Sequence, residues 1–507
     1  MLAVSTKTAS AKNSPRITVD TDASERISPA LAWAGVALAT AVAVALRSLY
    51  VGDQDLGYEE VFTASVVSHA SLTGVWHAIK ATESTPPLFY LLTWLWVKLA
   101  ASHTAVALRT SSLVAGSLTP PAAFLAMRSV VGQRTGLVVA WLCAISPLLV
   151  VDSIYARSYA LLVLVSTLSV WALGALLKRR SRLAWALWVA SATACLWTHY
   201  FTAFLVTAEA AVLFFRLPRD RRRLLASMAA LAAATAPLWP LLVTQSGASE
   251  RTAYIAARPL GRRLEETVRQ FVMGTNVPHA WLEGAGLLIV LLAALYGLVR
   301  TYRRPAIQVL LILAAIGAGL PIVSALSGID DHFLARNVLG VWICLAPLAA
   351  YGLTRLRGLP LVAYGAICLA TVVAVQSDWR YHGATDWRDA SALVQSRASN
   401  EVVAVMPGFE YPVPAFYMHR SLLSTPVRTT DLWVMVEPAR GAGQRALNPV
   451  GNPPLASLWG SGLQPVGEID HRGFRLIHLH AATPVTVPPV PFDNGPPSAP
   501  RARLLAP

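Results

Sequence analysis

Long apolar stretches without any Asp, Glu, Lys or Arg dominate this chain and limit what it can fold into. Six of them are residues 31–46, 136–151, 160–177, 287–299, 309–325 and 338–350. A helix needs about 20 mostly apolar residues to cross a bilayer, and most of these blocks reach that length once their flanks are included. Only 14% of the 507 residues are charged and 55% are hydrophobic, which is too little charge for the surface of a water-soluble protein. We therefore expect an all-α polytopic domain embedded in a lipid bilayer.

The cysteines and the N-terminal residues agree with this interpretation. The 4 cysteines all fall inside apolar blocks, at Cys143, Cys195, Cys344 and Cys368. Buried free thiols are more common there than disulfides or a metal site. Residues 1–28 are polar, and the first apolar block lacks a small-residue cleavage pattern, so we expect no signal peptide. We expect a disordered cytoplasmic tail at residues 1–28, followed by an uncleaved first span.

Clusters of basic residues predict which side of the membrane each loop faces. Short loops rich in Lys and Arg stay on the cytoplasmic side. Five such clusters lie at residues 128–134, 178–182, 216–223, 300–304 and 355–357. Two spans fit between consecutive clusters, so the intervening turns and everything after the last span face outward. Because the net charge of +15 is spread over these loops instead of one domain, we expect no nucleic-acid partner.

Residues 86–99 decide the number of spans. This segment, PPLFYLLTWLWVKL, is apolar enough to form a helix but short for a span. If it crossed, every later basic cluster would move to the outside, against the charge rule. We therefore expect an interfacial helix with Tyr90, Trp94 and Trp96 at headgroup depth. The result is eleven spans, an inner N-terminus, an outer C-terminus and a long first outer loop at residues 48–104.

Shifts in composition divide the chain into a membrane domain, residues 29–377, and a polar, mixed region, residues 378–480. In the second region we expect a helix at 387–397 and strands at 401–406 and 474–480. This pattern predicts a small extracytoplasmic α/β domain. Residues 481–507 are dominated by Pro and Ala, and we expect a disordered tail there.

Four carboxylates crowd the start of the first outer loop, namely Asp53, Asp55, Glu59 and Glu60. One interpretation is that Glu59 and Glu60 are first-turn acids favoured by a helix dipole. The other is a reactive site, since like charges near an apolar interface raise each other's pKa, which suits a general base. Their spacing alone leaves both interpretations open.

Several short motifs of the chain together resemble a known family. They are LGYEEVFT at 56–63, ESTPPLFYLL at 83–92, Ser-Pro at 146–147, YARSYAL at 155–161, THYF at 198–201, FLARN at 333–337 and DWR at 386–388. In this order they resemble the polyprenol-phosphate-sugar glycosyltransferases of the GT-C superfamily, in particular bacterial members of the family-39-like, protein-mannosyltransferase-related branch. The resemblance implies inverting transfer of a sugar from a polyprenyl-phosphate donor to an acceptor hydroxyl on the extracytoplasmic face of the plasma membrane.

The resemblance also implies which residues react. In that family an Asp-Glu pair opens the first outer loop, and its first acid deprotonates the acceptor. The matching positions are Glu59 and Glu60, with Glu in place of Asp. The second outer loop of the family typically reads Gln-Glu-Ala-Arg, where this chain has Ile-Tyr-Ala-Arg at 154–157. Asp152 is the candidate replacement for the missing acid, so the expected catalytic residues are Glu59, Glu60 and Asp152.

A lipid-phosphate donor lies with its phosphate at the membrane interface, and a cation there would hold the phosphate and stabilise it as it leaves. Arg157 and Arg336 each lie at the outer end of a predicted span and are the candidate phosphate ligands. The alternative is that their side chains reach outward to ordinary lipid headgroups.

Further candidates for substrate contact are Glu83, Tyr155, His199 and Tyr200. His199 lies in a two-residue turn, where a structural or interfacial role is the alternative. The Asp-Asp-His run at 330–332 has the residue types of a divalent-metal site, but such a cluster in a loop is more often simply solvated. We expect neither a metal nor another cofactor.

Two other functions remain open at this point. A transporter or flippase of lipid-linked glycans predicts ionisable residues near mid-span and internal symmetry. Glu209 is the main mid-span acid, and we find no internal repeat. A catalytically silent assembly subunit would explain the altered motifs. The sequence does not fix the sugar, nor whether the acceptor is a protein, a lipid or a cell-wall glycan.

Overall fold

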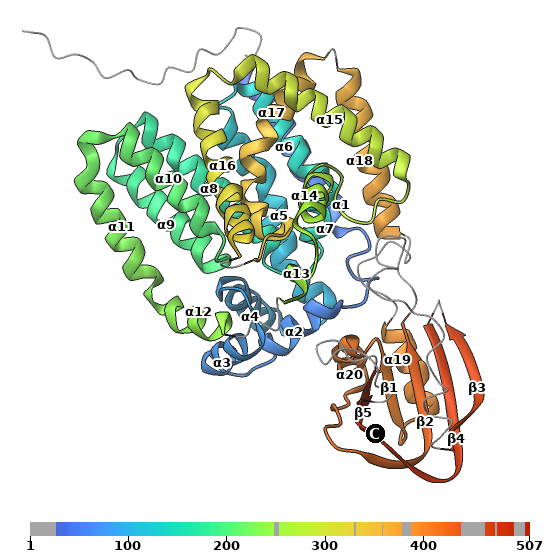
Figure 1. Cartoon of the computed structure of the whole chain (residues 1–507). Helices are drawn as coiled ribbons and strands as arrows, with labels where there is room; N and C mark the ends of the chain where they lie inside the picture. The colour runs from blue at the N-terminus through green and yellow to red at the C-terminus, as the bar shows by residue number, and fades with distance from the viewer. Residues whose placement is uncertain are drawn as a thin grey trace, which may run out of the picture.

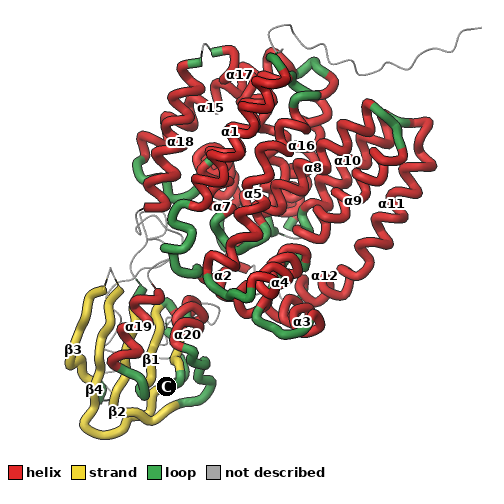
Figure 2. Tube along the Cα trace, turned by 180° about the vertical axis from the view of Figure 1, so that it is seen from behind, coloured by secondary structure: helices red, strands yellow, loops and turns green. Residues whose placement is uncertain are grey.

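The computed structural model describes residues 27–247, 253–328, 331–356, 358–377, 387–437, 462–471, 474–490 and 502–507. They form a large helical bundle with a small unit of helices and strands at one end (Figure 1, Figure 2). The tail predicted at residues 1–28 lies outside the described residues except for its last two.

Helices occupy every position at which the sequence predicts a span. In the described residues, seven helices or helix runs are long and apolar enough to cross a membrane, and a bent pair raises this number to eight. The seven are α1 (Pro29–Ser48), α8 (Tyr159–Lys178), α11 with α12 (Arg221–Thr235, Trp239–Ser246), α15 (Ala280–Thr301), α16 (Pro305–Ser327), η5 with α17 (Ala335–Val341, Trp342–Arg355) and α18 (Leu359–Ser377). The bent pair is α6 (Gln133–Ile145) with α7 (Pro147–Ser153). The remaining positions hold α5 (Ala105–Met127), α9 (Arg182–Thr198) and α10 (Thr202–Arg216). Because α9 and α10 are only 17 and 15 residues long, the total of eleven spans stays a prediction.

Helices α15 and α17 approach so closely that their backbones touch. A Cβ atom at Gly297 would lie 2.0 Å from the carbonyl oxygen of Leu348, and one at Gly352 would lie 2.0 Å from that of Ala293. Each glycine thus faces the carbonyl four residues before the other. Small residues allow such close packing between membrane helices, while the opposite face of α15 exposes leucines such as Leu288 and Leu292.

Helices α6 and α7 form one broken helix with a bend of 53°. The break occurs because Pro147 has no N–H to donate to the preceding turn. Arg47, fully buried at the end of α1, donates to the orphaned carbonyls of Cys143 and Ala144, each at 3.0 Å, and to that of Leu149 at 3.4 Å. Arg47 therefore supplies the hydrogen bonds that the break removes.

Three short helices lie together at one end of the bundle (Figure 1). They are α2 (Tyr58–Val67), α3 (Leu72–Thr82) and α4 (Leu88–Ala100). With 13 residues, α4 is about 20 Å long, less than the thickness of a bilayer core of about 30 Å. The indole of Trp94 donates to the carbonyl of His69 at 2.9 Å, which ties α4 to the turn between α2 and α3. The length of α4 agrees with the interfacial helix predicted at residues 86–99.

The C-terminal unit has the helix and both strands expected from the sequence. Within its described residues, a five-stranded sheet has the order β3-β4-β2-β1-β5, in which β1 and β2 pair in parallel and the other neighbours are antiparallel. The elements are α19 (Trp387–Arg397), β1 (Val402–Met406), α20 (Pro412–Met418), β2 (Val427–Val436), β3 (Gln464–His471), β4 (Phe474–Val487) and β5 (Arg503–Leu505). Because β4 continues to Val487 and β5 pairs with β1, the disordered tail expected at 481–507 is corrected at these two places.

The C-terminal unit shares an apolar core with the α2–α4 segment. Val61 and Ala64 of α2 belong to the same buried cluster as Trp387 of α19 and Val413 of α20. This continuous core fixes the C-terminal unit against the end of the bundle that carries α2.

Candidate active site

Glu59 and Glu60 begin helix α2 and point to different surroundings. Gly57 caps the helix, and its N–H donates to the Glu60 carboxylate at 2.9 Å. Glu60 is fully buried, and Arg109 of α5 binds both of its carboxylate oxygens, at 2.8 and 2.7 Å. The N–H of Ala156 donates to the same carboxylate at 2.8 Å. All of these partners are structural, so Glu60 is bound within the fold.

Arg109 also binds the loop before α2 through hydrogen bonds. Its guanidinium donates to the carbonyls of Val51 and Gln54 at 2.8 Å and of Asp55 at 2.7 Å. Arg109 could not be found from the sequence motifs, because it belongs to none of them. One signal in the sequence could have identified Arg109: it is a single charged residue within a predicted span, and such residues are rare unless they have a function.

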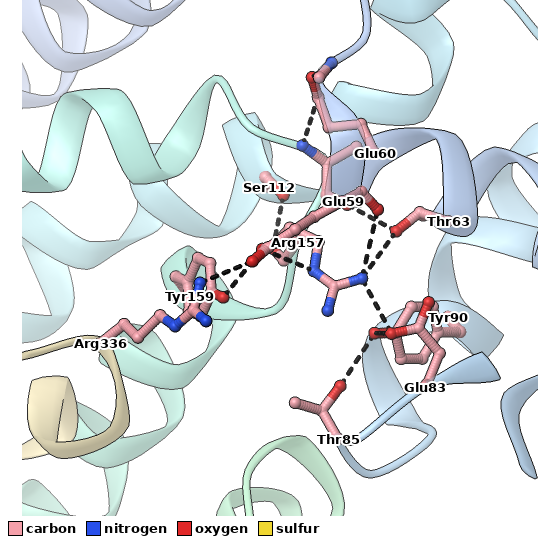
Figure 3. Close-up of polar contacts among 12 residues, drawn as sticks. Glu59, Glu60, Thr63, Glu83, Thr85, Tyr90, Ser112, Arg157, Tyr159 and Arg336 are labelled. Atoms are coloured by element: carbon pink, nitrogen blue, oxygen red, sulfur yellow. Dashed lines mark hydrogen bonds and ion pairs between the residues drawn. The ribbon is translucent and has the colours of Figure 1, made fainter. Parts of the chain in front are cut away.

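Glu59 lies between two guanidinium groups (Figure 3). Its Oε1 is 2.6 Å from Nη1 of Arg336, and its Oε2 is 3.5 Å from Nε of Arg157. The hydroxyl of Tyr159 donates to Oε2 at 3.2 Å. Burial alone would raise the pKa of Glu59, but the charges of Arg336 and Arg157 and these hydrogen bonds outweigh it and lower the pKa to about 2. Glu59 is therefore ionised, and a quarter of its side chain remains exposed.

Arg157 is anchored by a second carboxylate. Its Nη1 lies 2.9 Å from Oε2 of Glu83, which also accepts a hydrogen bond of 2.6 Å from the Tyr90 hydroxyl. The hydroxyls of Thr85 and Tyr90 lie 2.9 Å apart. Glu83 thus occupies a buried position where it holds an arginine, and Thr85 extends the same network.

Arg336, in η5, is more exposed than Arg157. A residue from the segment before α15 contacts its side chain. The hydroxyl of Tyr254, in α13 (Ala253–Ala256), binds its guanidinium. The loop leading to Arg336 is fixed by Arg263 of α14 (Leu260–Met273), which binds both carboxylate oxygens of Asp331 at 2.6 Å. Asp331, one of the three residues of the metal candidate at 330–332, is thus paired with a buried arginine, and Asp330 lies outside the described residues. The described residues contain no group of three or more His, Cys, Asp or Glu suited to a metal.

The structure brings Asp152 and Tyr155 close to the Glu59 cluster. Asp152 lies in the last turn of α7, where the charges of Arg336 and Glu59 act on its carboxyl group. Its carboxylate has no hydrogen bond or ion pair among the described residues. The Tyr155 hydroxyl packs on Gly57, where an added Cβ would lie 3.0 Å from it. Tyr155 therefore shapes the cap of α2.

His199 and Tyr200 hold structural contacts. His199 is buried and its Nδ1 accepts from the N–H of Phe201 at 3.3 Å. Burial, followed by the charges of Arg336 and Arg157, lowers the pKa of His199 to about 4. The Tyr200 hydroxyl donates to Gln245 at 2.7 Å, and Gln245 in turn donates to the carbonyl of Ile79 at 3.3 Å. Tyr200 therefore links the α9–α10 turn to α12 and α3.

Comparisons with known proteins agree with this architecture. Residues 84–243 match the model of the dolichyl-phosphate-mannose-protein mannosyltransferase family. A search of curated protein sequences finds no match.

Among solved structures, ArnT from Cupriavidus metallidurans in the apo state matches with a TM-score of 0.54 and 13% identity, over 89% of this chain and 98% of that one. ArnT bound to undecaprenyl phosphate matches with a TM-score of 0.53 and 12% identity, over 87% and 97%. The Archaeoglobus fulgidus oligosaccharyltransferase is more distant, with a TM-score of 0.46 and 17% identity over 71% and 55%.

The helical membrane bundle, the short helices at one end and the added α/β unit define a protein of the GT-C fold. The chain shares this fold with ArnT, and it resembles the GT-C superfamily of membrane glycosyltransferases. The family-model match covers residues 84–243, and it makes this part of the chain similar to dolichyl-phosphate-mannose-protein mannosyltransferases.

Proposed function

We propose that the protein transfers a sugar from a polyprenyl-phosphate donor to an acceptor hydroxyl on the extracytoplasmic face of the membrane. The observation that carries this proposal is the meeting of Glu59, Arg157 and Arg336, which come from α2, the α7–α8 turn and η5. A carboxylate beside two guanidiniums supplies a base and a site for a phosphate leaving group. The reported ArnT complex with undecaprenyl phosphate supports a polyprenyl carrier, and the family match favours mannose as the first sugar to test.

The donor phosphate would compete with Glu59 for its arginines. Arg157 retains Glu83 as a counterion, whereas Glu59 is the carboxylate that binds Arg336 among the described residues. A phosphate bound by Arg336 therefore displaces Glu59 and adds negative charge beside it. Both changes raise the pKa of Glu59 from its low resting value, so that donor binding converts a counterion into a base.

The proposed sugar transfer is a single displacement. Glu59 takes the proton of the acceptor hydroxyl while the acceptor oxygen forms a bond to the anomeric carbon. The bond from that carbon to the phosphate oxygen breaks, and its electron pair leaves with polyprenyl phosphate against Arg157 and Arg336. Attack opposite the leaving group inverts the anomeric configuration. Asp152, close to Glu59, is the proposed second acid that takes the proton onward.

Glu60 has a different proposed role from the one implied by the resemblance. Because Arg109, Gly57 and Ala156 occupy its carboxylate, we assign it to positioning the first turn of α2. The transporter alternative rests on Glu209, which accepts hydrogen bonds from Ser169 at 2.7 Å and Trp188 at 2.8 Å inside the bundle. Both hydrogen bonds end on Oε2 of Glu209, which is thereby held within the bundle.

The proposal is tested by incubating the purified protein with a panel of polyprenyl-phosphate sugars and candidate acceptors and measuring the release of polyprenyl phosphate. We expect release with one donor, and we expect Glu59→Gln to abolish it while thermal stability and polyprenyl-phosphate binding persist. Asp53→Asn is the matched control, because Asp53 is an exposed acid of the same loop. A fully active Glu59→Gln protein would overturn the proposed base. Donor binding without release from any donor would favour the silent subunit.

A further inference from the structure

The C-terminal unit holds the residues immediately before Glu59. The Asp55 carboxylate accepts a 2.6 Å hydrogen bond from the backbone N–H of Arg388 and lies 3.2 Å from its guanidinium. The Tyr417 hydroxyl accepts from the N–H of Leu56 at 2.7 Å. Both contacts join segments more than 300 residues apart and end within four residues of Glu59. The loop before α2 is therefore bound to the C-terminal unit by specific polar contacts.

Asp55 is held from two sides at once. Its carbonyl accepts a 2.7 Å hydrogen bond from Arg109 of the bundle, while its carboxylate binds Arg388 of the C-terminal unit. Between Asp55 and Glu59 lies Gly57, the N-cap of α2, whose N–H donates to the Glu60 carboxylate at 2.9 Å. The contacts of Asp55 and Leu56 with the C-terminal unit therefore act together with the Glu60 network to fix the direction in which the first turn of α2 projects Glu59.

The apolar contact between the two parts does not depend on these hydrogen bonds. Val61 and Ala64 of α2 pack in one buried cluster with Trp387 and Val413. Removing a polar contact therefore leaves the C-terminal unit docked and frees only the loop that precedes Glu59. This separation allows the polar contacts to be tested one at a time in a folded protein.

We propose that Asp55, Arg388 and Tyr417 are positioning residues for Glu59, so that the C-terminal unit sets the rate of the chemical step. The proposal rests on the proposed role of Glu59 as the base. A shift of about 1 Å in a reacting group can lower a rate by about 100-fold, so the loss of one hydrogen bond at this loop has a measurable effect. The effect falls on kcat, because the donor-binding arginines belong to other segments.

The experiment compares Tyr417→Phe, Asp55→Asn and Asp55→Ala in the full-length protein. Tyr417→Phe removes the hydroxyl that accepts from the Leu56 N–H and interacts with Arg388. We expect kcat to fall about 10-fold in a protein that stays folded and keeps its polyprenyl-phosphate affinity. Asp55→Asn retains an acceptor for the Arg388 N–H, whereas Asp55→Ala does not, so the alanine variant is the slower of the two. Tyr411→Phe is the matched control, because the Tyr411 hydroxyl has no hydrogen bond within the described residues.

Two results would overturn the inference. One is wild-type kcat in Tyr417→Phe while Glu59→Gln is inactive. The other is a loss of kcat that only follows a loss of folded protein, which would make the contacts purely structural. If Asp55→Ala does not fold, Tyr417→Phe decides the question alone. An active Glu59→Gln protein is a separate outcome. It would refute the proposed role of Glu59 as the base, and not merely the proposed positioning of Glu59 by the C-terminal unit.

Discussion

Glu59 Oε1 and Arg336 Nη1 lie 2.6 Å apart although 277 residues separate them in the sequence. The other oxygen of Glu59 faces Arg157 and Tyr159. In this state the proposed base is the counterion of the proposed phosphate ligands. The arrangement implies a competition between carboxylate and phosphate that substitutions can measure.

Replacing either arginine should weaken donor binding, with different side effects. We expect Arg336→Gln and Arg157→Gln each to lower polyprenyl-phosphate affinity about 10- to 100-fold, because each removes a charge-assisted contact of about 1.5–3 kcal/mol. Arg157→Gln should also destabilise the fold, since it leaves buried Glu83 without its guanidinium. Titration calorimetry and thermal unfolding measure the two effects. Arg262→Gln, an exposed arginine of α14, is the control, and unchanged affinity in both variants would refute the phosphate site.

The Glu60–Arg109 pair should contribute mainly to stability. Both side chains are buried, at 0 and 1% exposure. Breaking such a pair leaves an uncompensated charge and costs about 3–5 kcal/mol. We expect Glu60→Gln to lower the unfolding temperature in detergent far more than Asp53→Asn does. A Glu60→Gln protein with wild-type stability but no activity would return Glu60 to the catalytic residues.

His199 should make stability depend on pH in a defined window. Its pKa is about 4 in the folded protein and about 6.5 in an unfolded chain. Between these values the unfolded state binds more protons, so the free energy of unfolding decreases as pH falls from about 6.5 toward 4. The full contribution is about 3 kcal/mol. Unfolding midpoints measured across this window should vary less in His199→Gln than in wild type, and exposed His103→Gln should behave as wild type.

The contact between α15 and α17 should tolerate no added methyl group. Gly352→Ala places a Cβ against the carbonyl of Ala293, so the helices must separate, at a cost of about 1–3 kcal/mol. Gly319→Ala is the control, because a Cβ there meets nothing within 4 Å. Thermal unfolding in lipid nanodiscs compares the two. Equal midpoints would show that the helices can separate without loss.

The helices could be predicted from the sequence because an apolar block of that length must satisfy its backbone hydrogen bonds internally in a bilayer, and a helix does so. The break before Pro147 also has a local cause. The interaction of Arg47 with that break could not be predicted, since it joins residues about 100 positions apart. The contact between Arg263 of α14 and Asp331 could not be predicted for the same reason, since it joins residues 68 positions apart.

The site was predictable only as a set of separate residues. The family resemblance selected Glu59, Arg157 and Arg336, and the structure places them together. It did not select Arg109, Tyr254 or Tyr417, because their functional contacts are with partners distant in sequence and belong to no short motif. It implied a catalytic role for Glu60, and Tyr200 was a candidate for substrate contact; the structure shows that each also has a partner within the fold.

The distance in sequence between Glu59 and Arg336 also bears on how the protein is made. A ribosome delivers α2 directly after the first span, whereas η5 arrives only near the end of the bundle, and Arg388 later still. A partly inserted chain therefore exposes Glu59 without Arg336 and without the support of the C-terminal unit. If the proposed chemistry holds, no nascent form can consume lipid-linked sugar, and activity begins only when translation is nearly complete.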